Sequence, residues 1–174
     1  MILVISTCSQ NLSENEFVRP IENLLLKNSF DFKTKHYSEI SDASGYDKII
    51  ICGTALKDFE YLKDMNKFSW IKKYEGKLLG ICSGVQIIAT IFGMPLKEES
   101  QIGTRKVNTL IANPLMEGKF NAYFLSSKQP ILGKEVVPLT EDESVIKFKG
   151  KEFYGCMFHP EVLNSEIIIK FCNL

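Results

Sequence analysis

The sequence predicts a three-layer α/β fold, with a central, mostly parallel sheet flanked by helices and an antiparallel extension in its second half. In the first half, short apolar runs alternate with amphipathic stretches, and parallel strands need such crossover segments between them. From about residue 102 to 158 the apolar runs are β-like and follow one another without a helical stretch, broken by prolines and glycines. That change of pattern predicts the antiparallel part.

The first half supplies three strands and one clear helix. Residues 2–7 predict a buried strand. Residues 31–37 predict a second strand and residues 48–52 a third, which ends at Gly53. Ser13 and Glu16 have the spacing of a capping box, which predicts Ser13 as the N-cap of a helix of about four turns. Behind it Phe17, Ile21, Leu24 and Leu25 recur at helical spacing, so they are expected to face the core.

The middle and the end of the chain continue the alternation. Residues 58–74 are predicted to be helical, with Phe59, Leu62 and Trp70 facing inward. Residues 77–81 predict another strand, and a helix from Val85 is expected to stop near Gly93. The last apolar run, 152–158, ends at His159, and residues 165–172 predict a closing helix. With no repeat or linker visible, residues 1–174 are expected to form one domain.

The composition limits the classes of function. The chain has 21 Lys and Arg residues and 21 Asp and Glu residues, so it carries no overall charge that would favour nucleic acid or an anionic membrane as a partner. No apolar run approaches the length of a membrane span. The apolar start is too short for a signal peptide and has no basic segment before it. We therefore expect a cytoplasmic protein.

Five cysteines are spaced widely and in odd number, without a C-x-x-C pair, and only two histidines accompany them. This pattern predicts no metal site, and nothing in the sequence demands an organic cofactor. Four cysteines stand in apolar runs, where a free cysteine behaves as a small buried hydrophobe: Cys8, Cys52, Cys156 and Cys172.

Cys82 has a different neighbourhood, because its strand ends in Gly80-Ile81-Cys82-Ser83-Gly84 and runs directly into a helix. A strand, a G-x-C-x-G turn and a helix form the cysteine version of a nucleophile elbow. The glycines are expected to permit close backbone approach. The sulfur would project at the carboxyl end of a strand, with the Ser83 N–H directed at a developing oxyanion. The alternative is a glycine-rich turn with a bystander cysteine.

A cysteine nucleophile needs a partner that moves protons, and two histidines are available. His36 follows a polar strand and is expected at the surface. His159 stands in Phe158-His159-Pro160-Glu161, where Pro160 biases it toward extended geometry. Glu161 is placed to orient the imidazole. The alternative for this segment is a turn at a strand end with an exposed carboxylate.

The run from Gly80 to Gln86, G-I-C-S-G-V-Q, resembles the nucleophile segment of the class I, triad-type glutamine amidotransferases, and F-H-P-E near the C-terminus resembles their catalytic pair. The resemblance implies their flavodoxin-like fold and glutamine as substrate. It also implies that Cys82 forms a γ-glutamyl thioester, that His159 protonates the leaving ammonia and activates water, and that Glu161 orients His159. Gln86 would help to bind glutamine; its alternative is a helix surface residue.

Two segments depart from the family pattern. Cys52-Gly53-Thr54-Ala55 has threonine near where the family has a second oxyanion glycine, so either the Gly53 or the Thr54 N–H can serve. We interpret this as a turn that flips only when a partner docks. Many relatives have Y-H-S after a later strand, where this chain has Ser126-Ser127-Lys128-Gln129-Pro130. Ser126 and Ser127 are expected to wrap the substrate there.

A chain of this size resembles a glutaminase subunit without its synthetase, so ammonia would pass to a separate synthetase partner, either GMP synthase-like or anthranilate/aminodeoxychorismate synthase-like. The sequence does not choose between these acceptors. A second interpretation is a stand-alone γ-glutamyl hydrolase of the same superfamily. A third is a non-catalytic regulatory subunit, which the presence of Cys82, His159 and Glu161 together disfavours.

Overall fold

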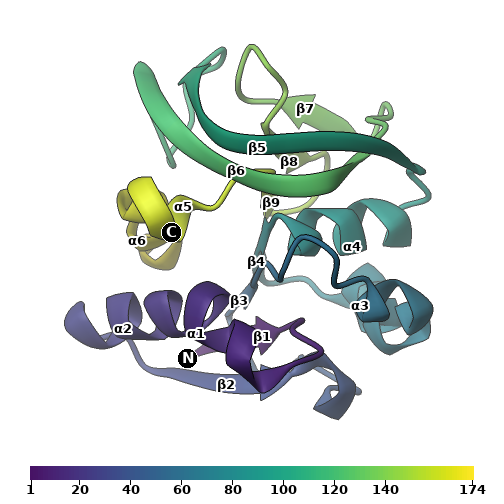
Figure 1. Ribbon diagram of the computed structural model, residues 1–174. Helices are drawn as coiled ribbons and strands as arrows, with labels where there is room; N and C mark the ends of the chain where they lie inside the picture. The colour runs from purple at the N-terminus through teal and green to yellow at the C-terminus, as the bar shows by residue number, and fades with distance from the viewer.

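The computed structural model describes residues 1–174, and its centre is a seven-stranded sheet in the order β2-β1-β3-β4-β9-β8-β7 (Figure 1). A separate two-stranded ribbon, β5-β6, lies beside it. The strands are β1 (Ile2–Ser6), β2 (Phe32–His36), β3 (Lys48–Ile51), β4 (Lys77–Ile81), β5 (Leu96–Asn108), β6 (Lys119–Pro130), β7 (Val136–Pro138), β8 (Val145–Phe148) and β9 (Phe153–Cys156).

The sheet confirms the predicted architecture, including its mixed direction. The pairs β1–β2, β1–β3, β3–β4 and β4–β9 are parallel, and the pairs β9–β8 and β8–β7 are antiparallel. The antiparallel extension therefore continues the sheet beyond β9 and also supplies the separate β5–β6 ribbon. The helices are α1 (Glu14–Phe17), α2 (Arg19–Lys27), α3 (Glu60–Lys63), α4 (Ser83–Ile91), α5 (Pro160–Leu163) and α6 (Ser165–Asn173), with 3₁₀ turns at Asn11–Ser13, Tyr37–Glu39 and Met65–Lys73.

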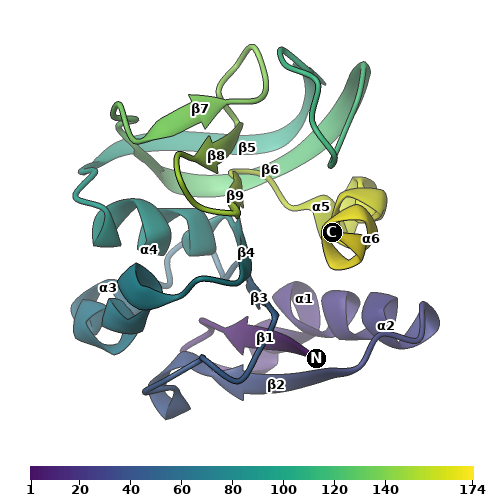
Figure 2. The ribbon, with the colours of Figure 1, turned by 180° about the vertical axis from the view of Figure 1, so that it is seen from behind.

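Helices cover the two faces of the sheet, as both ribbon views show (Figures 1 and 2). On one face α2 and α6 pack through residues such as Ile21, Leu25 and Phe171 against Val4 and Leu79. The other face is covered by α3, α4 and the 3₁₀ segment Met65–Lys73. Neighbouring residues of a strand point to opposite faces, which is why continuous apolar runs, buried on both sides, form the central strands.

The 58–74 prediction is confirmed only in part. That stretch is one short α-helix followed by a long 3₁₀ segment rather than a single helix. Trp70 faces inward as expected, whereas Phe59 and Leu62 are only half-buried.

The predicted start of the first helix is wrong. Ser13 has helical backbone angles, φ −66° and ψ −23°, and its side chain caps nothing. The expected four-turn helix is divided at Val18 into α1 and α2, because Pro20 in the first turn of α2 lacks the N–H that a continuous helix needs. Phe17, Ile21 and Leu25 nevertheless face the core as expected.

The β5–β6 ribbon begins earlier than predicted, at Leu96 rather than near residue 102. It runs beside α4 and α5, and the carbonyl of Tyr123 in β6 accepts a hydrogen bond of 2.8 Å from the His159 N–H. The ribbon therefore closes one side of the sheet edge where His159 lies. None of the helices combines the length and the apolar character needed to cross a bilayer.

Candidate active site

Three adjacent parallel strands end at the same edge of the sheet, and each is followed by residues that could bind a ligand or take part in a reaction. Gly53 and Thr54 follow β3, Cys82 follows β4, and His159 follows β9. Because β3, β4 and β9 are neighbours with the same direction, their carboxyl ends meet, where open α/β sheets bind their ligands.

Cys82 occupies a strained turn between β4 and α4. Its φ is +49° and its ψ −101°, a backbone conformation that costs a non-glycine residue about 1–3 kcal/mol. The flanking glycines make the turn possible. A β-carbon on Gly84 would lie 2.4 Å from the Ile51 carbonyl oxygen, and one on Gly80 would lie 2.7 Å from the Gly84 carbonyl carbon. The close approach predicted for both glycines is confirmed.

His159 and Glu161 form a buried pair. The Nδ1 of His159 lies 2.8 Å from Glu161 Oε1, and each side chain is 1% exposed. A carboxylate only accepts hydrogen bonds, so Nδ1 carries the proton and donates it. The backbone of His159, with φ −101° and ψ 89°, lies outside the helical region that the following proline disfavours, but just short of the extended geometry that was predicted. The exposed carboxylate of the alternative interpretation is not observed.

The other ring nitrogen, Nε2, is buried and has no hydrogen-bond partner, and the Cys82 Sγ instead donates to the Leu125 carbonyl oxygen at 3.5 Å. Burial by itself lowers the pKa of His159. Once the Cys82 thiol has lost its proton, the negative charge on the sulfur, together with Glu161, raises that pKa well above 6.5. The imidazole is therefore placed to carry a proton beside the sulfur at neutral pH.

The position of the His159 ring leaves no room for a side chain at residue 53, which is glycine. A β-carbon at this position would lie 2.6 Å from His159 Cε1 and 3.5 Å from the Cys82 β-carbon. The carbonyl groups before and at Gly53 are held by two hydroxyls: Ser83 Oγ donates to the Cys52 oxygen at 3.1 Å, and Thr7 Oγ1 lies 3.2 Å from that oxygen and 3.4 Å from the Gly53 oxygen. These contacts fix the chain that follows β3.

The N–H groups of Gly53 and Thr54 donate to no acceptor in the chain, which leaves both free for an oxyanion. Thr54 itself is buried, and its hydroxyl donates to Asp58 Oδ2 at 2.8 Å. The same oxygen accepts the Ser9 N–H at 2.7 Å. Although burial alone raises it, the pKa of Asp58 is lowered by these hydrogen bonds, so the carboxylate stays charged and anchors the Thr54 turn.

Gln86 is 4% exposed, so its interpretation as a helix surface residue is wrong. Its Nε2 donates to the Lys128 carbonyl oxygen at 3.0 Å and to Ser126 Oγ at 3.3 Å, and Tyr61 Oη donates to its Oε1 at 2.5 Å. Ser127 donates its hydroxyl to the Leu56 carbonyl oxygen at 3.2 Å. The segment after residue 125, which differs from the family pattern, therefore does border this site.

A small cavity joins these groups. It measures about 10 Å³, room for about one water molecule, and is lined by residues of three segments: Thr54, Ala55, Leu56, Asp58, Phe59, Tyr61, Cys82, Ser83, Gln86, Leu125, Ser126 and Ser127. An amino acid does not fit into this volume. Ligand entry therefore needs a movement of its walls.

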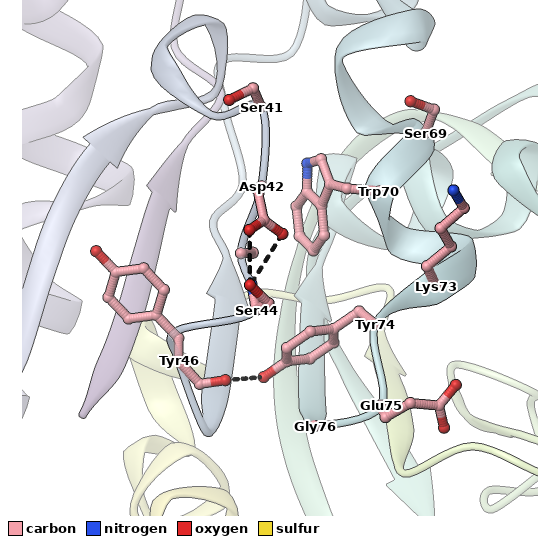
Figure 3. A pocket seen from close by; sticks show the side chains of 11 residues that line it. Ser41, Asp42, Ser44, Tyr46, Ser69, Trp70, Lys73, Tyr74, Glu75 and Gly76 are labelled. Carbon is pink, nitrogen blue, oxygen red and sulfur yellow. Dashed lines mark hydrogen bonds between the residues drawn. The ribbon is translucent and has the colours of Figure 1, made fainter.

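A larger cavity lies at the other end of the strands. Its volume is about 660 Å³, and its walls come from the segments that precede β3 and β4, residues 41–46 and 69–76 (Figure 3). Figure 3 shows two polar groups there already paired, Asp42 with Ser44 and the Tyr74 hydroxyl with the Tyr46 carbonyl. It contains neither cysteine nor histidine, whereas Cys82 lines the small cavity.

The four remaining thiols lie in the core, as predicted. Burial is the main cause that raises the pKa of each, to about 12 for Cys172, so they stay protonated near neutral pH. His36, expected at the surface, is half-buried and lies 2.7 Å from Ser38 Oγ.

Sequence reasoning missed two residues of the site. Thr7 lies just beyond β1 and contacts Ser83 Oγ at 3.0 Å, and its position after a buried strand was the available signal. Tyr61 belongs to a stretch without clear periodicity, and no sequence signal pointed from it to Gln86.

Comparisons with known proteins point to one family. The family model described as "Glutamine amidotransferase class-I" matches residues 10–169. One of the subunits of the GMP synthase [glutamine-hydrolyzing] of Methanosphaera stadtmanae is 28% identical over 160 residues, which cover 84% of this chain and 82% of that protein. The GMP synthase [glutamine-hydrolyzing] of Thermotoga petrophila is 25% identical over 174 residues, 95% of this chain, and the match spans only 33% of that relative's length.

Solved structures show the same fold. A GMP synthase subunit from Thermoplasma acidophilum superposes with a TM-score of 0.83 at 20% identity, over 99% of this chain and 93% of the other. A glutamine amidotransferase of Thermotoga maritima gives 0.71 at 17% identity, over 92% of this chain and 75% of the other. Identities this low support the fold alone.

Proposed function

Because this chain belongs to the class I glutamine amidotransferase family, we propose that it hydrolyses the side-chain amide of glutamine at Cys82 and delivers the ammonia to a separate synthetase subunit. The observation that carries the proposal is the convergence of Cys82, His159 and Glu161 at the carboxyl ends of β4 and β9. The Cys82 thiol shares a cavity with Thr54, whose backbone N–H donates to no acceptor in the chain.

The proposed reaction begins when the Cys82 thiol passes its proton to His159 Nε2. The sulfur then bonds to the amide carbon, and an electron pair moves to the amide oxygen. The N–H of Ser83, with that of Gly53 or Thr54, stabilises this oxyanion. The pair returns, the carbon–nitrogen bond breaks, and His159 Nε2 donates its proton so that ammonia leaves. Glu161 holds the imidazole through Nδ1 and stabilises its charge.

The second half of the reaction consumes the γ-glutamyl thioester. Water gives a proton to Nε2 of His159 while its oxygen attacks the thioester carbon, the carbon–sulfur bond breaks, and glutamate leaves. Gln86, Ser126 and Ser127 line the cavity together with Cys82, and in this proposal they bind the amino-acid end of glutamine. The chain's own groups supply every proton transfer in this scheme.

For the partner, a GMP synthase-like synthetase is the better-supported candidate. The relative from Methanosphaera stadtmanae is itself named as one subunit of a GMP synthase, and it matches this chain over most of the length of both. An anthranilate synthase component 2 of Archaeoglobus fulgidus is 30% identical, but only over 51% of this chain. The small volume of the cavity adds a reason for partner dependence, because docking of the partner would have to widen it.

The test measures ammonia released from glutamine by the wild type, by Cys82→Ser and by the control Cys172→Ser, each by itself and with a GMP synthase synthetase subunit. We expect weak release without the synthetase, strong release with it, none from Cys82→Ser and unchanged release from the control. Release by Cys82→Ser at the wild-type rate would exclude the cysteine mechanism. Vigorous turnover of γ-glutamyl peptides by the isolated chain would instead identify the stand-alone hydrolase.

A further inference from the structure

Tyr61 is a buried residue that neither the sequence pattern nor the family resemblance assigns to the site. It belongs to α3, is 1% exposed, and lines the same cavity as Cys82 and Gln86. Its hydroxyl donates to Gln86 Oε1 at 2.5 Å. It therefore contacts, from the α3 side, the residue that we expect to bind the substrate.

The hydrogen bonds determine which way the Gln86 amide faces. The Lys128 carbonyl oxygen can only accept, so the end of the amide that lies 3.0 Å from it is the NH₂ group. The opposite end is then the carbonyl oxygen, and Tyr61 must donate to it. In the reverse orientation the amide would place its oxygen against the Lys128 oxygen, where two acceptors repel.

We propose that Tyr61 is a positioning residue for glutamine binding, which holds the Gln86 amide in the orientation that recognises the substrate. This inference rests on the proposed function. Tyr61 holds the Gln86 amide from α3, while Ser126 and Lys128 hold it from β6. These three hydrogen bonds together oppose rotation of the amide. Burial, with the nearby charges of Cys82 and Asp58, raises the pKa of Tyr61, which keeps its hydroxyl a donor at every working pH.

The expected defect is one of binding rather than chemistry, because the hydrogen bonds of the Gln86 side chain go to Tyr61, Ser126 and Lys128 and not to Cys82 or His159. In Tyr61→Phe the Gln86 oxygen stays buried without its donor, and KM for glutamine rises about tenfold while kcat changes less than about twofold. The matched control is Tyr37→Phe. Tyr37 is also a buried tyrosine, and its hydroxyl donates to Asp64 at 3.0 Å, outside the cavity.

The experiment compares wild type, Tyr61→Phe, Tyr37→Phe, Gln86→Leu and the double variant, all with the synthetase subunit present. If Tyr61 acts through Gln86, Tyr61→Phe adds no further rise in KM in the Gln86→Leu background. Labelling of Cys82 by the diazoketone analogue of glutamine should need about ten times more reagent for half-saturation in Tyr61→Phe. Labelling by iodoacetamide should be unchanged, which shows that the variant is folded.

An unchanged KM in Tyr61→Phe, or a full effect that persists in the Gln86→Leu background, would overturn the inference while the wild type still hydrolyses glutamine. A fall in kcat alone would also overturn it, because that assigns Tyr61 to the chemical step. A wild type that neither releases ammonia nor reacts with the diazoketone would contradict the proposed function and this inference with it.

Discussion

The charge on His159 decides whether the site can protonate a leaving group. Burial disfavours the imidazolium, but the Cys82 sulfur and Glu161 together raise the pKa of His159 well above 6.5. A raised pKa means that the proton stays on the ring as pH rises past 6.5 and leaves only at higher pH. The site is therefore built to present a donor at neutral pH.

This charge balance predicts the effect of removing either partner. In Cys82→Ser and in Glu161→Gln the pKa of His159 should fall, because one raising neighbour is gone and burial remains. NMR titration of the imidazole protons measures it, and His36→Gln assigns the signals because the chain has only two histidines. A pKa of His159 that stays the same in both variants would contradict this description of the site.

Much of the residue-scale picture could be read from the sequence, although the roles of these residues stay proposals. Cys82, His159 and Glu161 were selected from two short motifs, and the structure places them together. The environment of Gln86 was not predictable, because it depends on Tyr61, 25 positions away, and on backbone groups of β6. A sequence pattern specifies neighbours along an element but not contacts across the fold.

At the scale of elements, the turn between β4 and α4 has a strained backbone and also places Cys82 at the carboxyl end of the sheet. Cys82 keeps a positive φ because α4 and β4 pack on both sides of it, and Gly84 lies against the Ile51 carbonyl.

At Ser13, by contrast, a local sequence motif did not determine the structure. Its spacing was right for a capping box, but Pro20 interrupted the helix behind it, and a local motif did not outweigh that backbone constraint.

The strained turn predicts an unusual order of stabilities. Cys82→Gly should be more stable than Cys82→Ala by about 1 kcal/mol, because glycine adopts a positive φ without the side-chain clash. Ala89→Gly in the buried interior of α4 is the control, and there glycine should be less stable than alanine by about 1 kcal/mol. Urea unfolding at neutral pH measures the free energy of unfolding of the wild type, Cys82→Gly, Cys82→Ala and Ala89→Gly.

If Cys82→Gly proves less stable than Cys82→Ala, the turn is not strained at this residue and the description of its geometry is wrong. The control guards against a general effect of glycine, since the sign should reverse between the two positions.

At the scale of the whole molecule, the parallel order of β3, β4 and β9 brings three distant segments to one edge. The sequence predicted the α/β class and the antiparallel second half, because hydrophobic periodicity reports burial directly. The path of the β5–β6 ribbon beside the site was not predictable, since it depends on packing between segments far apart in the chain. The small volume of the cavity beside Cys82, about 10 Å³, likewise follows from how these segments meet.

The central claim is that Cys82 carries the γ-glutamyl group, and rapid quenching with glutamine tests it most directly. The wild type is mixed with glutamine and a GMP synthase synthetase, quenched with acid, digested and analysed by mass spectrometry. We predict a γ-glutamyl adduct on the peptide that contains Cys82, removed by hydroxylamine, and unmodified peptides for the other four cysteines. Ammonia release without any adduct on Cys82, or an adduct on another cysteine, would contradict the claim.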